Sequence, residues 1–358
     1  MNPAADRPDG LPAPLAELHL HLEGTLEPGT IFELARRNAT PLPYADVDDL
    51  AGRYRFSDLQ SFLDLYYANM ATLRSRGDFE EMAWRYLVRA RTAGVRHAEV
   101  FVDPQAHTAR GVPASTVLRG VDDALRRATE DLGISGAVIV CALRDRPATE
   151  ALEMLDTCLA TGVPILGIGL DSAEAGHPPA DFAEVFDVAA QAGLRRVCHA
   201  GEEGPPDYIR QALDLLGAER IDHGVRCLED PALVARLASE RVPLTVCPLS
   251  NVRLRVVGEL AEHPLRRMLD SGLMVCVNSD DPAYFGGYLD DNLRACADAL
   301  TLSPAELHTL AANSVNASFA PEPRKRELLE QLTAWRAPAP RQPATTPVVR
   351  SPGQPEPL

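Results

Sequence analysis

The sequence contains no CxxC pair, no long hydrophobic run and no excess of positive charge, and each absence excludes a class of protein. Its seven cysteines are odd in number and mostly lie inside apolar segments, which is typical of free thiols in a reducing compartment. The longest apolar stretch, near 163–170, is too short to cross a bilayer, and the first ten residues lack the apolar core of a signal peptide. With a formal net charge of −16, the chain repels phosphate backbones and anionic lipid. We therefore expect a cytoplasmic protein that binds neither nucleic acid nor membranes.

Eight short apolar segments rich in β-forming residues recur along the 358 residues, and helical patterns separate them. They lie at 16–23, 95–104, 136–144, 164–172, 195–202, 220–226, 243–251 and 273–282. Apolar strands that alternate with helices indicate a parallel sheet covered by helices. Eight such units favour an α/β fold of the (β/α)8 TIM-barrel type. The rival is an open doubly wound sheet, which is weakened because no GxGxxG motif follows the first strand.

The gap between the first two strands is long enough to hold extra helices, which the barrel would place over its mouth. One helix is predicted to begin at Ser57, with Gln60 three residues later as in a capping box. Its apolar face consists of Leu59, Phe62, Leu63 and Tyr66. A later helix is predicted over 207–216, ended by Gly217.

The composition changes after Trp335, where proline, threonine and serine replace large apolar residues. Such a segment cannot bury enough surface to fold. We therefore predict a single domain over residues 1–336 and a disordered proline-rich tail over 337–358.

Polar residues gather where the predicted strands end, which is where active sites of such barrels form. His19 and His21 are two apart on the first strand, so their side chains point the same way and can offer two imidazoles to one metal ion. Taken alone, an HxH pair is more often just a pair of polar residues at a strand end. His199, at the end of the fifth strand, adds a third imidazole.

Further polar residues follow at three of the strand ends. Glu202 lies three residues after His199, in a loop where a carboxyl group can face a ligand. His223 ends the sixth strand, and Asp280 and Asp281 end the eighth. Taken alone, either aspartate would more often be a turn residue or a helix cap, and His223 would more often be an ordinary surface or core residue. Converging at one barrel mouth, they supply three imidazoles and a carboxylate for zinc, with a further His and Glu as the acid and base of a hydrolysis.

The motifs around these residues resemble those of the adenosine/adenine deaminase family of the amidohydrolase superfamily. They read LHLHLEGTLEP, HAGEEGPPDYI, RIDHGVR, LTVCPLSN and VNSDDPAYFGGY, in the family's order, and span roughly residues 17–316. The resemblance implies a distorted (β/α)8 barrel with one zinc ion per chain. The positions that match the family's metal ligands are His19, His21, His199 and Asp280.

The resemblance also implies the catalytic roles. Glu202 matches the proton donor to purine N1, and His223 matches the residue that orients the attacking water and helps to deprotonate it. Asp281 matches the aspartate that contacts the purine at N7. Protonation of N1 requires a neutral Glu202, and therefore a raised pKa. A different zinc deaminase fold uses HxE and PCxxC motifs, and the absence of CxxC excludes it.

The first motif bears on the choice of substrate. Family members that act on adenosine carry HxHxDG, whereas this chain has HxHxEG with Glu23 in place of the aspartate, and so looks like the branch that deaminates adenine. We expect Glu23 to continue the first strand, to point into the mouth and to occupy the space of a ribose. The resemblance then implies that the protein converts adenine to hypoxanthine and ammonia. The alternatives are a deaminase of adenosine or another 6-aminopurine nucleoside such as aminodeoxyfutalosine, and a purine-binding protein that has lost catalysis.

Overall fold

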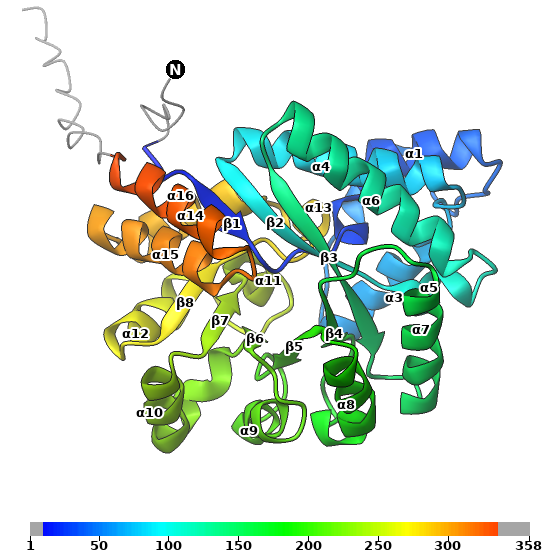
Figure 1. Cartoon of the computed structure of the whole chain (residues 1–358). Coiled ribbons are helices and arrows are strands. Elements are labelled where there is room, and N and C mark those ends of the chain that lie inside the picture. The colour runs from blue at the N-terminus through cyan, green and yellow to red at the C-terminus, as the bar shows by residue number, and fades with distance from the viewer. Residues whose placement is uncertain (1–9, 336–358) are drawn as a thin grey trace, which may run out of the picture.

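Eight parallel strands form one sheet in chain order in the computed structural model, which describes residues 10–335 (Figure 1). The strands are β1 (Leu15–Glu17), β2 (Val95–Val102), β3 (Ser135–Leu143), β4 (Gly167–Asp171), β5 (Arg195–Ala200), β6 (Arg220–His223), β7 (Pro243–Val246) and β8 (Met274–Val277). A parallel bridge between Leu20 and Asp280 joins the chain beyond β1 to the chain beyond β8. The predicted (β/α)8 TIM-type fold is confirmed.

Sixteen α-helices accompany the strands within residues 10–335. They are α1 (Pro28–Arg37), α2 (Val47–Gly52), α3 (Leu59–Met70), α4 (Arg76–Thr92), α5 (Pro104–Thr108), α6 (Ala114–Asp131), α7 (Ala148–Ala160), α8 (Ala183–Gln191), α9 (Pro206–Asp214), α10 (Pro231–Glu240), α11 (Pro248–Arg253), α12 (Leu265–Asp270), α13 (Pro282–Phe285), α14 (Leu289–Ala299), α15 (Pro304–Ala317) and α16 (Glu322–Thr333). Short 3-10 helices are η1 (Glu23–Thr25), η2 (Pro179–Phe182), η3 (Val225–Glu229) and η4 (Leu260–Glu262). None of these helices is both long and apolar enough to cross a membrane.

The strands are buried because helices cover the outside of the sheet. β6 and β8 are buried at every residue, as expected of parallel strands with both faces covered. All seven cysteines are buried and free, which confirms the prediction of unpaired thiols. The core is continuous from the sheet into the surrounding helices.

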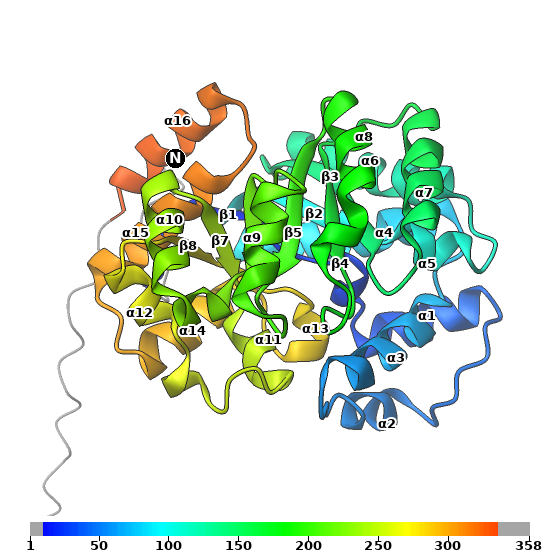
Figure 2. The ribbon, with the colours of Figure 1, turned by 90° about the horizontal axis from the view of Figure 1, so that it is seen from below.

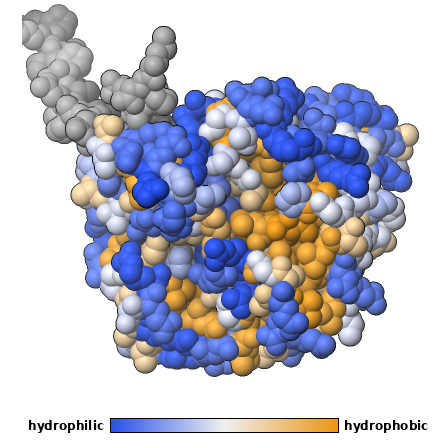
Figure 3. Space-filling model, in the orientation of Figure 1, coloured by the Kyte–Doolittle hydropathy of each residue, from blue (hydrophilic) through white to orange (hydrophobic). Residues whose placement is uncertain are grey.

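The extra helices after the first strand lie at one end of the barrel. Figure 2 shows α1, α2 and α3 together on the side toward which the strand arrowheads point. Figure 3 shows the other end of the barrel, away from α1, α2 and α3. Hydrophobic residues gather in one area of that face, with hydrophilic residues around them. The strands therefore direct their carboxyl ends, and the residues that follow them, toward the extra helices.

The predicted ends of several elements were wrong by a few residues. β1 and β8 are short, because the polar residues that follow them leave the ladder for loops and turns. The N-cap of α3 lies one residue later than predicted, because Asp58 rather than Ser57 caps the helix, and the capping box is completed by Ser61 rather than Gln60. α9 ends at Asp214, and Gly217 adopts a left-handed φ of 59° just beyond it. The predicted disordered tail lies outside the described residues.

Candidate active site

One pocket at the carboxyl ends of the strands brings the predicted polar residues together. Six of them line it: His21, His199, Glu202, His223, Asp280 and Asp281. Apolar side chains of α3 form the opposite wall, and they are the predicted face of Leu59, Phe62, Leu63 and Tyr66. Of the extra helices, α3 thus covers the barrel mouth. His19 is fully buried directly behind this lining.

Three histidines and one aspartate face one another at the bottom of the pocket. Oδ1 of Asp280 lies 3.4 Å from Nε2 of His19 and 3.5 Å from Nε2 of His21. Nε2 of His21 lies 3.2 Å from Nε2 of His199. One donor atom from each of the four residues lies within 4.8 Å of the others. The HxH pair and the ends of β5 and β8 therefore form a single buried cluster.

The donor set fits a tetrahedral metal ion. Ligands about 2.1 Å from a tetrahedral centre stand about 3.4 Å from one another, which matches the spacing of the cluster. Nε2 of His19 is buried and has no hydrogen-bond partner. Burial lowers the pKa of His21 to about 4, although the charge of Asp280 acts against it. Burial and the neighbouring histidines hold the pKa of His199 well below its usual range. Neutral imidazoles of this kind have a lone pair available for a cation.

Residues behind the cluster fix the orientation of the imidazoles. Nδ1 of His19 lies 3.2 Å from the carbonyl oxygen of Thr245, to which it donates. The hydrogen on Nδ1 leaves the lone pair of Nε2 free to face the pocket. Asp222 is fully buried, accepts a hydrogen bond from the hydroxyl of Thr245 at 2.7 Å and lies 3.7 Å from Nδ1 of His199. Sequence reasoning missed Asp222, although it directly precedes His223.

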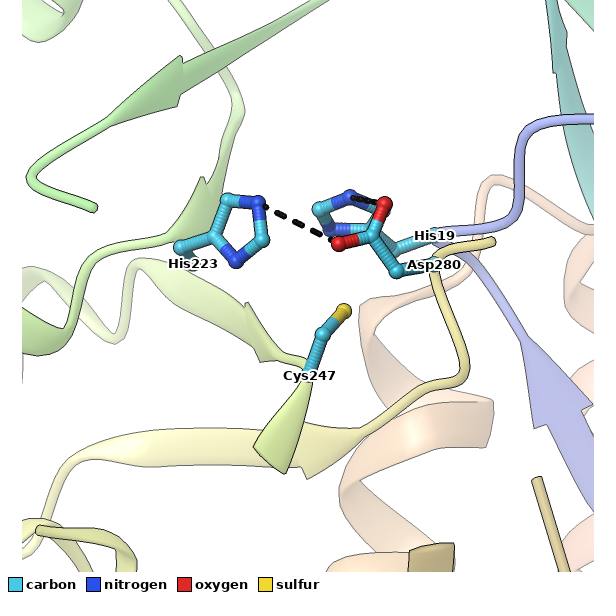
Figure 4. A group of neighbouring side chains, drawn as sticks. All are labelled: His19, His223, Cys247 and Asp280. Atoms are coloured by element: carbon cyan, nitrogen blue, oxygen red, sulfur yellow. Dashed lines mark ion pairs between the residues drawn. The ribbon is translucent and has the colours of Figure 1, made fainter. Parts of the chain in front are cut away.

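A second set of donors overlaps with the first. Figure 4 shows His223 and the sulfur of Cys247 facing His19 and Asp280. Burial and then the charge of Asp280 raise the pKa of the Cys247 thiol well above its usual range, so the sulfur stays protonated. Since the thiolate is the metal-binding form of cysteine, the set with three histidines is the better metal site.

Glu202 and His223 lie side by side next to the cluster. Nε2 of His223 is 3.5 Å from Oε2 of Glu202 and 3.8 Å from Oδ2 of Asp280. Burial, then the charges of Asp280 and Glu174, raise the pKa of Glu202 well above its usual range. Burial also lowers the pKa of His223 to about 3. These shifts favour a protonated carboxyl group beside a neutral imidazole.

Asn251 joins these two groups, and the sequence analysis did not identify it. Its Nδ2 donates to Oε1 of Glu202 at 3.0 Å and lies 3.5 Å from Nδ1 of His223. Its Oδ1 accepts from Nε2 of His263 at 3.1 Å. The signal was present, because Asn251 closes the LTVCPLSN motif. Asn251 leaves Oε2 of Glu202 facing His223 and the pocket.

Asp281 stands against the chain that follows the metal-site histidines. A Cβ atom on residue 24 would lie 2.0 Å from Oδ1 of Asp281, so this position requires glycine. Oδ1 is buried and has no hydrogen-bond partner. Burial and the neighbouring charge of Asp280 raise the pKa of Asp281 well above its usual range. These two causes favour the neutral form of the carboxyl group, which is the form that can donate to a ligand.

Glu23 does not continue the first strand, and that part of the prediction was wrong. It begins η1, because the chain turns immediately after the two histidines. Its side chain is fully buried and is absent from the pocket lining. Oε1 accepts from Nε2 of His107 at 2.7 Å and from the backbone N–H of Asp103 at 3.2 Å. Asp103 does line the pocket, so Glu23 contacts the pocket wall indirectly, through its hydrogen bond with Asp103.

Comparison with known proteins places this geometry in a family. A family model described as adenosine deaminase matches residues 14–335. The chain is 58% identical over 331 residues to a Streptomyces coelicolor protein named adenine deaminase, covering 92% of this chain and 97% of the relative. A Cupriavidus necator protein of the same name is 52% identical over 335 residues, covering 93% and 95%.

Solved structures agree with the sequence comparisons. An adenine deaminase from Arthrobacter aurescens matches with a TM-score of 0.89 and 58% identity, covering 90% of this chain and 99% of that one. An amidohydrolase from Burkholderia ambifaria with bound zinc matches with a TM-score of 0.80 and 28% identity, covering 91% and 93%. The fold, the buried histidine and aspartate cluster and these matches have one explanation: the chain belongs to the adenosine deaminase family.

Proposed function

We propose that this protein hydrolyses adenine to hypoxanthine and ammonia, with one zinc ion held by His19, His21, His199 and Asp280. The observation that carries the proposal is the cluster of metal-binding donors next to a protonated carboxyl group in one buried pocket. The names of the relatives at 52–58% identity support adenine as the substrate. The zinc bound to the Burkholderia relative supports the choice of metal.

The bound metal and the side chains of the protein have different roles in the reaction. Bound zinc acts as a Lewis acid that makes water a nucleophile near neutral pH. The chain's own residues hold the purine, orient the water and move protons. In the overall reaction, water adds at C6 of adenine, N1 gains a proton, and the C6–N6 bond breaks as ammonia leaves.

Glu202 is the proton donor in this proposal. Its raised pKa keeps the carboxyl group protonated at neutral pH, which a general acid requires. The amide of Asn251 binds Oε1, so Oε2 is the oxygen that faces the pocket and would donate to purine N1. As N1 accepts the proton, the ring takes up the electrons displaced by attack at C6.

His223 orients the attacking water. Its Nε2 lies between Oε2 of Glu202 and Oδ2 of Asp280, so it faces the space between the proton donor and the metal-binding cluster. The backbones of His223 and Asp280 both have a φ of 63°, which is strained for residues other than glycine. Backbone strain of this kind persists at sites where the direction of a side chain matters. Here the side chains of His223 and Asp280 face each other.

Asp281 fixes the orientation of the ring. Purine N7 is a hydrogen-bond acceptor, and the carboxyl group of Asp281, which lines the pocket, can donate to it in its neutral form. The apolar wall of Phe62, Leu63 and Leu254 suits the face of a planar base. With N1 at Glu202 and N7 at Asp281, C6 and its amino group point toward the metal-binding cluster.

The pocket also favours a free base over a nucleoside. Asp103 and Asp171 both line it, and their buried carboxyl groups are hydrogen-bonded to each other. Adenine has an N–H group at N9 that could donate to one of these carboxyl groups, whereas in adenosine N9 carries ribose, which lacks that donor and needs additional room beside them. Glu23, which binds the backbone of Asp103, takes part in this choice by holding that wall in place.

A substrate panel tests the proposal. Adenine, adenosine and aminodeoxyfutalosine are compared by kcat/KM for ammonia release, with the metal content of the same preparation measured by elemental analysis. We expect adenine to be preferred by at least about 100-fold and zinc to be present at one per chain. A preference for adenosine would assign the same chemistry to nucleosides. Purine binding without ammonia release would assign the protein to the class of inactive binding proteins.

A further inference from the structure

Four successive backbone N–H groups converge on one carboxylate. Oε1 of Glu174 accepts from Gly201 N at 2.7 Å. Oε2 of Glu174 accepts from the backbone nitrogen atoms of Glu202, Glu203 and Gly204 at 3.0, 2.8 and 2.8 Å. The Glu174 residue is only 1% exposed. These bonds account for every backbone N–H of the loop 201–204, which carries the proposed proton donor.

The loop is shaped to receive this carboxylate. Consecutive N–H groups that point to one side form a concave site for an anion. Gly201 has a left-handed φ of 73°, which turns the chain at the start of the loop. A Cβ atom on residue 204 would lie 2.4 Å from Oε1 of Glu174, so only glycine allows the carboxylate to approach. The anion that fills the site is part of the protein itself.

The hydrogen bonds of Glu174 connect two neighbouring strands whose backbone pairing ends early. β4 and β5 pair only through Gly167 with Arg195 and Ile168 with Arg196, at the start of each strand. Their ladder does not extend to the carboxyl ends, where the pocket lies. Glu174 follows β4 and the loop 201–204 follows β5, so the carboxylate joins the two segments where backbone pairing has ended.

We propose that Glu174 is the residue that positions Glu202, holding the loop 201–204 so that the Glu202 carboxyl group faces the substrate pocket. The inference rests on the proposed function only in taking Glu202 as the proton donor. Glu174 does not line the pocket and would not touch the substrate. Glu174 affects catalysis by holding the backbone of the loop 201–204 and by its negative charge.

The charge of Glu174 works in the same direction as its geometry. Burial is the largest cause of the raised pKa of Glu202, and the charges of Asp280 and Glu174 add to it. A negative charge next to Glu202 disfavours its ionised form, which is the form that cannot donate. Glu174 therefore both positions the Glu202 carboxyl group and favours its protonated form.

A double-mutant cycle distinguishes positioning from general structural support. Glu174→Gln keeps the size of the side chain but replaces an acceptor oxygen with an N–H donor that faces the loop. We expect kcat for adenine to fall at least about tenfold, with KM changed by less than about threefold. In a Glu202→Gln background the same change should lower kcat by less than about twofold, since the donor is already absent.

The outcomes separate the inference from the proposed function. If the losses of kcat multiply in the double variant, Glu174 does not act through Glu202, and the inference is overturned while the proposed function stands. If Glu202→Gln alone keeps the wild-type kcat, both are overturned. Wild-type kcat in folded Glu174→Gln protein overturns the inference alone.

A second variant tests the same inference if the Glu174→Gln protein does not fold. Gly204→Ala leaves every charge in place but puts a methyl group against Oε1 of Glu174. We expect a loss of kcat at least about fivefold, which again disappears in the Glu202→Gln background. Gly29→Ala, at a helical glycine whose added Cβ would meet nothing within 4 Å, is the matched control and should leave kcat unchanged. A Gly204→Ala enzyme with the wild-type kcat would contradict the inference.

Discussion

Nε2 of His107 lies 2.7 Å from Oε1 of Glu23, and neither side chain is exposed to solvent. Nδ1 of the same imidazole lies 2.5 Å from a guanidinium nitrogen of Arg110. The Glu23 oxygen also accepts the backbone N–H of Asp103. A chain of contacts therefore runs from Arg110 through His107 and Glu23 to Asp103, which is part of the pocket wall.

The variant Glu23→Asp tests what this chain of contacts does. An aspartate is one methylene shorter and cannot reach both His107 and Asp103, so we expect the free energy of unfolding to fall by about 1–3 kcal/mol. As the Asp103 wall relaxes, kcat/KM should fall for adenine more than for adenosine. Denaturant titration and the two substrates measure this. Glu33→Asp, at a half-exposed helix position, is the control and should change little. An unchanged ratio of the two kcat/KM values would show that Glu23 has no part in substrate choice.

Removal of the metal should abolish activity and lower stability together. We expect a chelator to release one zinc ion per chain, to lower the thermal midpoint because bound metal stabilises only the folded state, and to be reversed by added zinc. His199→Ala should lose most of the metal, while His308→Ala, on α15, should retain it. Full activity in a preparation shown by elemental analysis to contain no metal would refute the proposed site.

Glu202→Gln should separate catalysis from metal binding. The amide has nearly the same shape but cannot donate a carboxylic proton, so we expect kcat to fall by about 10²–10⁴-fold with zinc content unchanged. Glu203→Gln is the matched control on the same loop, half-buried and outside the pocket lining, and should change kcat by less than about threefold. Equal losses in the two variants would argue against Glu202 as the donor.

The buried pair of Glu99 and Arg220 predicts how stability depends on pH. Both are fully buried, with Nη1 of Arg220 2.6 Å from Oε2 of Glu99. Burial alone would raise the pKa of Glu99, but Arg220 and His97 outweigh it and lower the pKa from 4.5 to about 2. A lowered carboxyl pKa contributes stability that is complete above pH 4.5 and is lost as pH falls toward 2.

Glu99→Gln should remove this contribution. It removes the nearer carboxylate partner of the buried Arg220 charge and leaves only Asp222, 3.8 Å from Nε, so we expect a loss of about 3–5 kcal/mol in the free energy of unfolding at pH 7. The difference between wild type and variant should narrow as pH falls from 4.5 toward 2. Urea titrations across that range measure it. A difference that stays constant with pH would mean that Glu99 is not ionised in the folded protein.

The eight strands and the main site residues could be predicted from the sequence because their signals are local. Apolar segments of strand length recur, and a polar residue at a strand end must reach the barrel mouth once the barrel closes. His19 and His21 share a face through the two-residue period of an extended chain. The same reasoning failed for Glu23, because the period no longer applies once the chain turns into η1.

Tertiary structure decided which distant residues complete the site. Glu174 binds a loop 27–30 residues away, Asn251 joins Glu202 to His223, and Asp222 reaches Thr245 and His199. Asn251 and Asp222 lie inside recognisable motifs, but no local pattern gives the role of these three side chains, because each role is set by hydrogen bonds that buried groups form across separate strands. The sequence by itself determined the chemistry that the barrel mouth carries. Only the folded barrel determined how that chemistry is held in place, since burial, shared charge and hydrogen bonds between strands arise after the chain has closed.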